Sequence, residues 1–266
     1  MNQAFRATID NEQRTGPGDY RINVEQYTGV IRWTLSRWPV LQVLAAQVSP
    51  AATFPRQWTQ VPANMTDISD PVLGVYGSSV PSGSGGAGGQ NIVIAPGYMG
   101  WWNGRNGFRL ACSYVNGWPH AGITANVLAG ATTLTVDDVT GWTGATGVIY
   151  DGANTETVHV TSVTANTPLT LPNSGGTAPA GPGTLTLAAG TTFAHTGATP
   201  ANVVVSAVPT DVLYANIMIC MIQALDAGIT SVSIQNIPGS QTQGGHGVAE
   251  LTTGWALILE PYKRVI

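Results

Sequence analysis

The sequence predicts an α+β protein that is mostly β, with a helical C-terminal part and an inserted small β-sandwich or barrel. Three observations lead to this prediction. Short alternating apolar segments between residues 21 and 115 are typical of half-buried strands. Residues 119–205, rich in Thr, Ala, Gly and Val, repeat short strand-like segments at regular spacing. Residues 211–227 are apolar and carry no charge between Asp211 and Asp226, as in a buried helix.

The N-terminal elements are predicted in chain order. Residues 1–20 are polar, contain Gly-Pro-Gly at 16–18, and are interpreted as an arm. Strands are predicted at 21–25, 30–35, 39–48, 91–95 and 108–115. Residues 62–90 are predicted to be a long loop with a flexible glycine-rich tip at 82–89. Residues 83–88 match the letters of a dinucleotide fingerprint, but a strand follows instead of a helix, so no cofactor is expected.

The middle of the chain is predicted to be an inserted β domain. A strand is expected at 131–137, and Asp-Gly-Ala-Asn at 151–154 predicts a hairpin between 148–150 and 155–160. Further short strands are expected at 169–171, 185–187 and 203–205. The predicted organisation is an arm at 1–20, a body formed by 21–118 and 206–266, and an inserted domain at 119–205.

The C-terminal part is predicted to contain two helices. Thr210 is a suitable N-cap and Gly228 a suitable end for a helix at 211–227. This segment is shorter than the ~20 apolar residues that span a bilayer. No membrane contact is therefore expected. The helix is expected to be buried in a core or in a subunit interface. A second helix is predicted at 248–259, before Pro261.

Charge is scarce and unevenly distributed. Charged residues make up 9% of the chain, whereas about 25% is usual for soluble proteins. Residues 1–109 hold eight arginines and six acids, and residues 110–266 hold two cations and eight acids. Sequence-specific nucleic-acid binding needs clustered Lys and Arg, so DNA contact is expected only as passive passage past a neutral or acidic wall.

No catalytic, cofactor or metal site is predicted, and the chain is not expected to be an enzyme. The four histidines are too far apart in sequence for a local zinc motif. Asp137 and Asp138 followed by Gly141 suit either a calcium loop or, much more commonly, a turn. Cys112 and Cys220 are interpreted as small buried hydrophobes.

Two sets of residues, each containing aromatic side chains, are candidate interfaces. Trp101 and Trp102, with Trp118, form either a carbohydrate platform or packing at a sheet or ring interface, and the nearby glycines favour packing. Tyr262, Lys263 and Arg264 form either a docking tail or an ordinary solvated terminus.

The order of several segments resembles the head–tail adaptor (connector) proteins of long-tailed double-stranded DNA phages. The segments are Tyr-Val-Asn-Gly-Trp at 114–118, Val-Pro-Thr-Asp at 208–211, the Ser/Val-rich strand at 230–234 and Pro-Tyr-Lys-Arg at 261–264. Upstream, Leu-Ser-Arg-Trp-Pro-Val-Leu-Gln-Val at 35–43 is similar to the strand pair of actinobacterial-phage members. The resemblance covers about 175 residues around the insertion, and the helical bundle that usually precedes them is short or missing.

The resemblance implies a structural virion protein at the head–tail neck, assembled in the host cytoplasm. It implies a homo-oligomeric ring, usually of twelve copies, that contacts the portal protein and a stopper or tail terminator protein while DNA passes through the lumen. The alternative function is a receptor- or carbohydrate-binding tail or baseplate protein, with 119–205 as the binding module.

Overall fold

The described part of the chain is mostly β structure. The computed structural model describes residues 6–16, 19–24, 31–37, 39–50, 56–62, 66–69, 76–77, 91–94, 107–172, 174–198, 201–209 and 212–213. Of the described residues, 53% lie in strands and 3% are helical. The predicted α+β class is therefore wrong for this part of the chain, in which no helical C-terminal part is evident.

The α+β prediction depended on the apolar segments at 211–227 and 248–259. Only Val212 and Leu213 of these segments are described, with helical backbone, and the remainder lies outside the described residues. Elsewhere in the described ranges, the helical element is a single 3-10 turn, Gly152–Asn154. Several described segments, among them Thr133–Val136 and Glu156–Ala165, are instead rich in β-branched residues, whose side chains fit a pleated sheet better than a helix.

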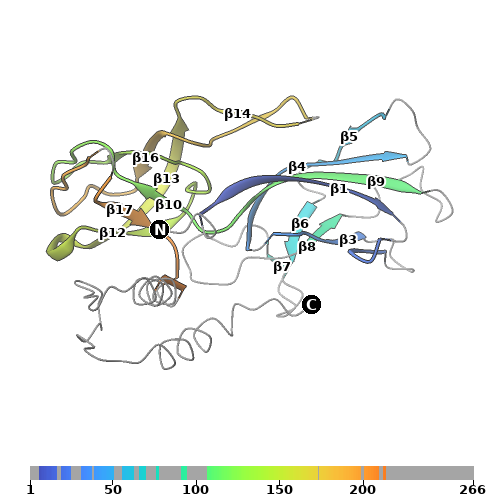
Figure 1. Ribbon diagram of the computed structural model, residues 1–266, viewed down its shortest axis with the longest axis horizontal. Coiled ribbons are helices and arrows are strands. Elements are labelled where there is room, and N and C mark those ends of the chain that lie inside the picture. The colour runs from blue at the N-terminus through green and yellow to red at the C-terminus, as the bar shows by residue number, and fades with distance from the viewer. Residues whose placement is uncertain are drawn as a thin grey trace, which may run out of the picture.

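One sheet of the body has four antiparallel strands in the order β1-β9-β4-β5. The strands are β1 (Thr8–Gly16), β9 (Phe108–Asn116), β4 (Val40–Pro50) and β5 (Thr59–Gln60). The pairing of β4 with β9 shifts register twice, near Leu41 and near Leu44. Such bulges bend and twist a strand, in keeping with the curved long strands in Figure 1.

A second sheet faces the first and closes the core of the body (Figure 1). Its order is β2-β3-β8-β6-β7, with β2 (Ile22–Val24), β3 (Ile31–Thr34), β8 (Asn91–Ile94), β6 (Thr66–Ser69) and β7 (Tyr76–Gly77). Trp33 and Leu35 from the second sheet's side pack with Phe108, Leu110 and Tyr114 from β9, and all five are fully buried. The strands predicted between 21 and 48, at 91–95 and at 108–115 are confirmed.

Two predictions for the N-terminal half are wrong. Residues 8–16 are not an arm, because β1 pairs with β9 along its whole length. Residues 66–69 and 76–77 are strands inside the predicted loop at 62–90, although the glycine-rich tip lies outside the described residues. Both errors have one cause: these segments hold few apolar residues, and pairing with a distant strand decides their conformation.

The inserted region forms a curled sheet with the order β10-β17-β12-β13-β16-β11. The strands are β10 (His120–Gly122), β17 (Val204–Ser206), β12 (Thr146–Tyr150), β13 (Glu156–Ala165), β16 (Gly183–Leu187) and β11 (Thr133–Val136). Beyond β10, Ile123 forms an antiparallel bridge with Val136 of β11. The Asp137 N–H donates to the Gly122 carbonyl at 3.0 Å, so the outermost strands meet and the sheet closes as a barrel.

The barrel has its own hydrophobic core, and a hairpin connects it to the body. The predicted hairpin around 151–154 is confirmed as β12 and β13. A second hairpin, β14 (Leu169–Thr170) and β15 (Thr177–Ala178), leaves the barrel and reaches toward β4 (Figure 1). Leu171 and Ala178 pack there with Ala45, in a cluster separate from both main cores. Whether residues 119–205 are a separable domain stays a prediction.

Candidate functional site

Glu12 is a buried carboxylate at the centre of a polar cluster in the body. Alternation along β1 turns its side chain inward, where it is 9% exposed. Its Oε1 accepts a hydrogen bond from Arg14 Nε at 2.8 Å. Its Oε2 accepts from the Ser36 N–H at 2.9 Å and from the Tyr114 hydroxyl at 3.3 Å. Both oxygens of the carboxylate are therefore engaged.

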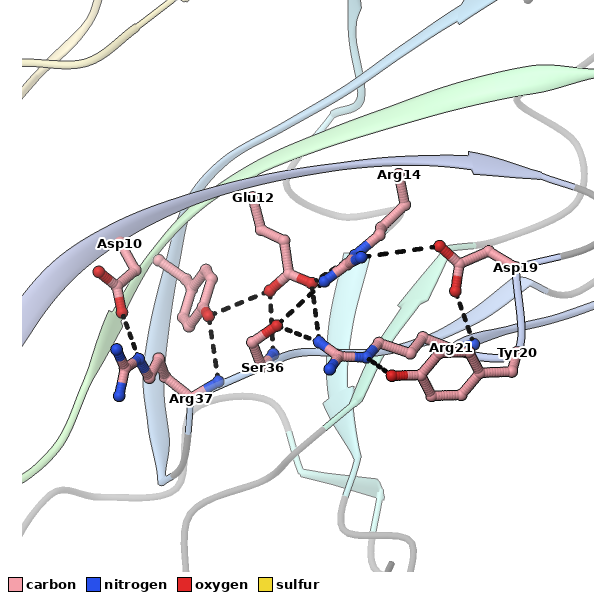
Figure 2. Close-up of polar contacts among 9 residues, drawn as sticks. Asp10, Glu12, Arg14, Asp19, Tyr20, Arg21, Ser36 and Arg37 are labelled. Carbon is pink, nitrogen blue, oxygen red and sulfur yellow. Dashed lines mark hydrogen bonds and ion pairs between the residues drawn. The ribbon is translucent and has the colours of Figure 1, made fainter.

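The cluster continues from β1 into the turn that precedes β2 (Figure 2). Arg21 Nη1 lies 3.5 Å from Glu12 Oε1 and also donates to Ser36 Oγ. Arg21 Nε donates to the Tyr20 hydroxyl at 2.8 Å, and the Arg21 N–H donates to Asp19 at 3.0 Å. The contacts therefore join β1, the turn before β2 and the segment after β3.

The electrostatics of this cluster keep Glu12 ionised. Burial alone would raise the pKa of Glu12, but the Ser36 N–H and the Arg14 guanidinium outweigh it, so the pKa is lowered. Burial, followed by the Glu12 charge, raises the pKa of Tyr114, which keeps its proton and donates it. A carboxylate with a lowered pKa and donors on both oxygens is a weak general base. The arrangement suits holding two sheets together better than proton transfer.

A second polar cluster lies in the barrel and is built around His195. The His195 side chain is fully buried, with Nδ1 at 2.9 Å from Asp151 Oδ2 and Nε2 at 2.8 Å from Glu156 Oε1. Glu156 also accepts the N–H groups of Thr192 and Phe193 at 2.7 and 3.2 Å. Burial raises the pKa of Glu156, but these donors and His195 outweigh it and lower the pKa. The cluster fastens the segment that contains His195 to the β12–β13 hairpin.

A third cluster joins the body to the barrel. Arg6 precedes β1, and its Nη2 donates to Asp137 Oδ1 at 3.0 Å, while its Nε donates to the His120 carbonyl at 3.2 Å. Burial, followed by the Arg6 charge, lowers the pKa of His120 to about 4. Asp138 accepts the N–H groups of Thr140 and Gly181. These contacts are those of a turn and favour that interpretation of Asp137 and Asp138 over a calcium loop.

The structure describes only some of the residues singled out in the sequence. Trp101, Trp102, Tyr262, Lys263 and Arg264 lie outside the described residues, as do Cys220 and the glycine-rich segment at 83–88. Trp118 is 8% exposed and packs with Val208, Val212 and Leu213, so it is not part of an open aromatic platform.

Cys112 and the possible metal ligands can be placed within the described residues. Cys112 is a free, buried thiol whose pKa is raised by burial and then by Glu12, in agreement with a small buried hydrophobe. Within the described ranges, no group of three or more His, Cys, Asp or Glu side chains is arranged to hold a metal ion.

Sequence reasoning missed all three polar clusters. Glu12 and Arg14 lie two residues apart on a strand and so share a face, which was the available signal for an inward pair. The interpretation of residues 1–20 as an arm leaves this signal unused. The partners of His195 are 39 and 44 residues away in sequence, and no local pattern joins them.

Comparisons with known proteins return no family model, no curated protein and no solved structure that matches this chain. In the part of the chain that the structure describes, no helix has the length and apolar character needed to cross a bilayer.

Proposed function

We propose that this chain is a structural virion protein of a tailed double-stranded DNA phage, a subunit of the head–tail adaptor ring. It would link the portal to a tail-side stopper or terminator protein and let DNA pass. The proposal is supported by the order of the segments at 35–43, 114–118, 208–211 and 261–264. Two of these segments, 114–118 and 208–211, flank the barrel strands, so the β insertion falls where the resemblance has its gap.

The observation that carries a ring assembly is the open edge of β1. β1 pairs with β9 on one side, and no other described strand pairs with its opposite edge. Asn11, Gln13 and Thr15 on this strand are exposed and polar. A long edge strand is a template for pairing with another chain unless it is covered. The barrel is closed and offers no such edge, so the body would make the ring contacts.

The polar clusters support a mechanical role. Arg6 holds the barrel to the body through Asp137, and Leu171 and Ala178 pack on Ala45 at a second point. Two separate contacts restrain a domain more strongly than a single linker does. The barrel would therefore keep a fixed orientation as the ring transmits force between head and tail.

The position of the chain in a virion tests this proposal. Antibodies raised against a barrel surface peptide, such as residues 161–166, would be applied to purified virions and imaged by electron microscopy. Label at the neck is expected, with the protein present in about a dozen copies by quantitative mass spectrometry of virions. Label at the tail tip, or a copy number of one to three, would instead favour the receptor- or carbohydrate-binding alternative.

The predicted docking tail at Tyr262, Lys263 and Arg264 stays part of the proposal. Removing one partner of a buried charged contact weakens the binding free energy of an interface by about 2–5 kcal/mol. Truncation after Glu260 is expected to leave the melting of the subunit unchanged and to block head–tail joining. Normal yields of tailed, infectious particles from the truncated protein would show that the tail is a solvated end.

A further inference from the structure

Two arginines of the body carry positive charges that no described carboxylate neutralises. Each carboxylate whose side chain is described lies within 4 Å of another arginine or of a histidine. Arg56 and Arg109 have no carboxylate partner among the described residues. Arg56 Nη1 donates to Gln13 Oε1 at 3.3 Å, which leaves the other N–H groups of this guanidinium available. Two cations without counter-charges mark a surface that suits an anion.

Arg56 and Arg109 line one hollow of about 370 Å³, together with Trp58. Arg56 is exposed, whereas Arg109 and Trp58 are half-buried. Asp19 also lines the hollow, but its carboxylate lies 3.8 Å from the Arg14 guanidinium (Figure 2). The excess charge in the hollow is therefore positive, and an aromatic ring forms part of the same wall.

The hollow lies at the end of the four-stranded sheet that is remote from the barrel. Arg109 is the second residue of β9, and the chain leaves the other end of this strand, at Asn116, for the barrel. Arg109 pairs in register with Thr15, near the C-terminal end of β1, and Thr15 also lines the hollow. Figure 1 shows the arrowhead of β1 on the side of the body away from the barrel. The hollow is therefore separate from the contacts that hold the barrel.

These side chains suit a carboxylate that belongs to a protein. A guanidinium binds a carboxylate through two parallel N–H···O bonds. Arg and Trp are also the residue types that most often dominate the binding energy of protein interfaces. A row of nucleic-acid phosphates needs more cations than these two, and the net charge of −4 on the chain repels such a polyanion. A second copy of this chain is a poor occupant, because its described carboxylates are already paired.

We propose that this hollow docks an acidic segment of a different protein. A Glu or Asp carboxylate of that segment binds to Arg56 and Arg109, and an apolar side chain beside it packs on Trp58. The position of the partner rests on the proposed function, because copies that pair side by side through β1 turn the ends of their strands along the ring axis. The hollow then faces a neck protein above or below the ring.

Fluorescence anisotropy on the full chain at low ionic strength tests the site. The probes are fluorescein-labelled: a Gly-Glu-Leu-Glu-Leu-Gly peptide, the same peptide with Gln in place of Glu, and hexathymidylate. The variants are Arg56→Gln, Arg56→Gln with Arg109→Gln, and Arg109→Lys, which keeps the charge but not the planar fork. Arg37→Gln is the matched control, because Arg37 is an exposed guanidinium elsewhere on the body, near Asp10.

Thermal melting checks that each variant folds. The Arg56 side chain is exposed, so Arg56→Gln should leave the fold intact and keeps the test decisive if the double variant unfolds. The acidic peptide is expected to bind, and either the Gln peptide or the double variant should bind about tenfold or more weakly. Arg56→Gln and Arg109→Lys should each weaken binding by a smaller factor, and Arg37→Gln should change it by less than about twofold.

The proposal is overturned if the acidic peptide does not bind, or if Arg37→Gln weakens binding as much as Arg56→Gln does. Tighter binding of hexathymidylate than of the acidic peptide would also overturn it and would assign the hollow to nucleic acid. Sedimentation velocity should show the same self-association for the wild type and the double variant, and self-association lost in the variant would assign the hollow to a second copy. Label at the tail tip of virions would reject only the ring-axis position of the partner, because peptide binding is measured on the isolated chain.

Discussion

The His195 ring and the Glu156 carboxylate meet at 2.8 Å inside the barrel, although 39 residues separate them in sequence. The other ring nitrogen lies 2.9 Å from Asp151. The imidazole is thus held between two carboxylates from opposite ends of the turn that joins β12 to β13. This arrangement fixes the last part of the barrel sequence against its first hairpin.

Replacing His195 should destabilise the barrel. His195→Ala removes a fully buried ring that contacts both Asp151 and Glu156, and it leaves a cavity in the barrel. Large-to-small changes at buried positions cost about 2–5 kcal/mol. We expect a loss of about 3 kcal/mol in the free energy of unfolding, measured by urea titration. His159→Ala is the control, because His159 is exposed on β13 and bonds only to Thr146, and it should cost less than about 0.5 kcal/mol. Equal losses in the two variants would contradict the structural role of His195.

Glu12→Gln tests the charge network of the body. The variant keeps the size of the side chain and loses its charge against Arg14, so we expect a loss of about 1–3 kcal/mol at pH 7. The folded pKa of Glu12 is lowered, so its stabilisation is present above the unfolded pKa and is lost as pH falls through the folded one. The difference between wild type and variant should therefore shrink below about pH 4. Asp10→Asn should have a smaller effect at any pH, because its contact with Arg37 is longer, at 3.7 Å, and the amide oxygen can still accept the hydrogen bond from Asn116.

His120 should make the protein sensitive to mild acid. Its folded pKa of about 4 lies below the usual value of 6.5, so the unfolded chain takes up the proton first. Stability should fall as pH drops from about 6.5 to about 4, by at most about 3 kcal/mol. His120→Gln should flatten this part of the profile of unfolding free energy against pH. A profile for the variant that falls as steeply as that of the wild type would show that another group is responsible.

Gly117 is required where the chain leaves β9 for the barrel. Its φ is +88°, and an added Cβ would lie 2.6 Å from the Arg6 carbonyl oxygen. Gly117→Ala therefore combines left-handed strain with a backbone clash, and we expect a loss of about 2–3 kcal/mol in thermal or urea unfolding. Gly144→Ala isolates the strain, because φ is +74° there and nothing lies within 4 Å of the added Cβ. If Gly117→Ala lowers the free energy of unfolding by no more than Gly144→Ala does, the backbone near Arg6 moves aside and relieves the clash.

Deleting the barrel tests whether it is a separable unit. His120 and Ser206 are opposite one another in the β10–β17 pair, so a short Gly/Ser linker can replace residues 122–205 without moving the ends of the body. We expect the remainder to melt cooperatively, at a lower temperature, because the Arg6 and Ala45 contacts with the barrel are lost. Loss of cooperative melting would show that the barrel is integral to the body.

Local pattern predicted the strands well where apolar and polar residues alternate or a turn sequence is strong. The β12–β13 hairpin followed from Asp-Gly-Ala-Asn at 151–154, and β9 followed from its apolar run. The same reasoning failed for β1, whose inward-facing residues include Glu12 and Arg14. A charged residue at an inward position removes the alternation by which a strand is recognised.

The sequence alone determined the positions of most strands, the scarcity of charge and the distinct composition of residues 119–205, because each depends on composition or on residues close together in the chain. Only the tertiary structure decided that residues 8–16 form an edge strand, that the inserted sheet closes through Ile123 and Val136, and that Glu12 meets Tyr114. These contacts join residues far apart in sequence, and Glu12 and Tyr114 are separated by 102 positions. Their stability comes from partners that fold into place together, which no local periodicity encodes.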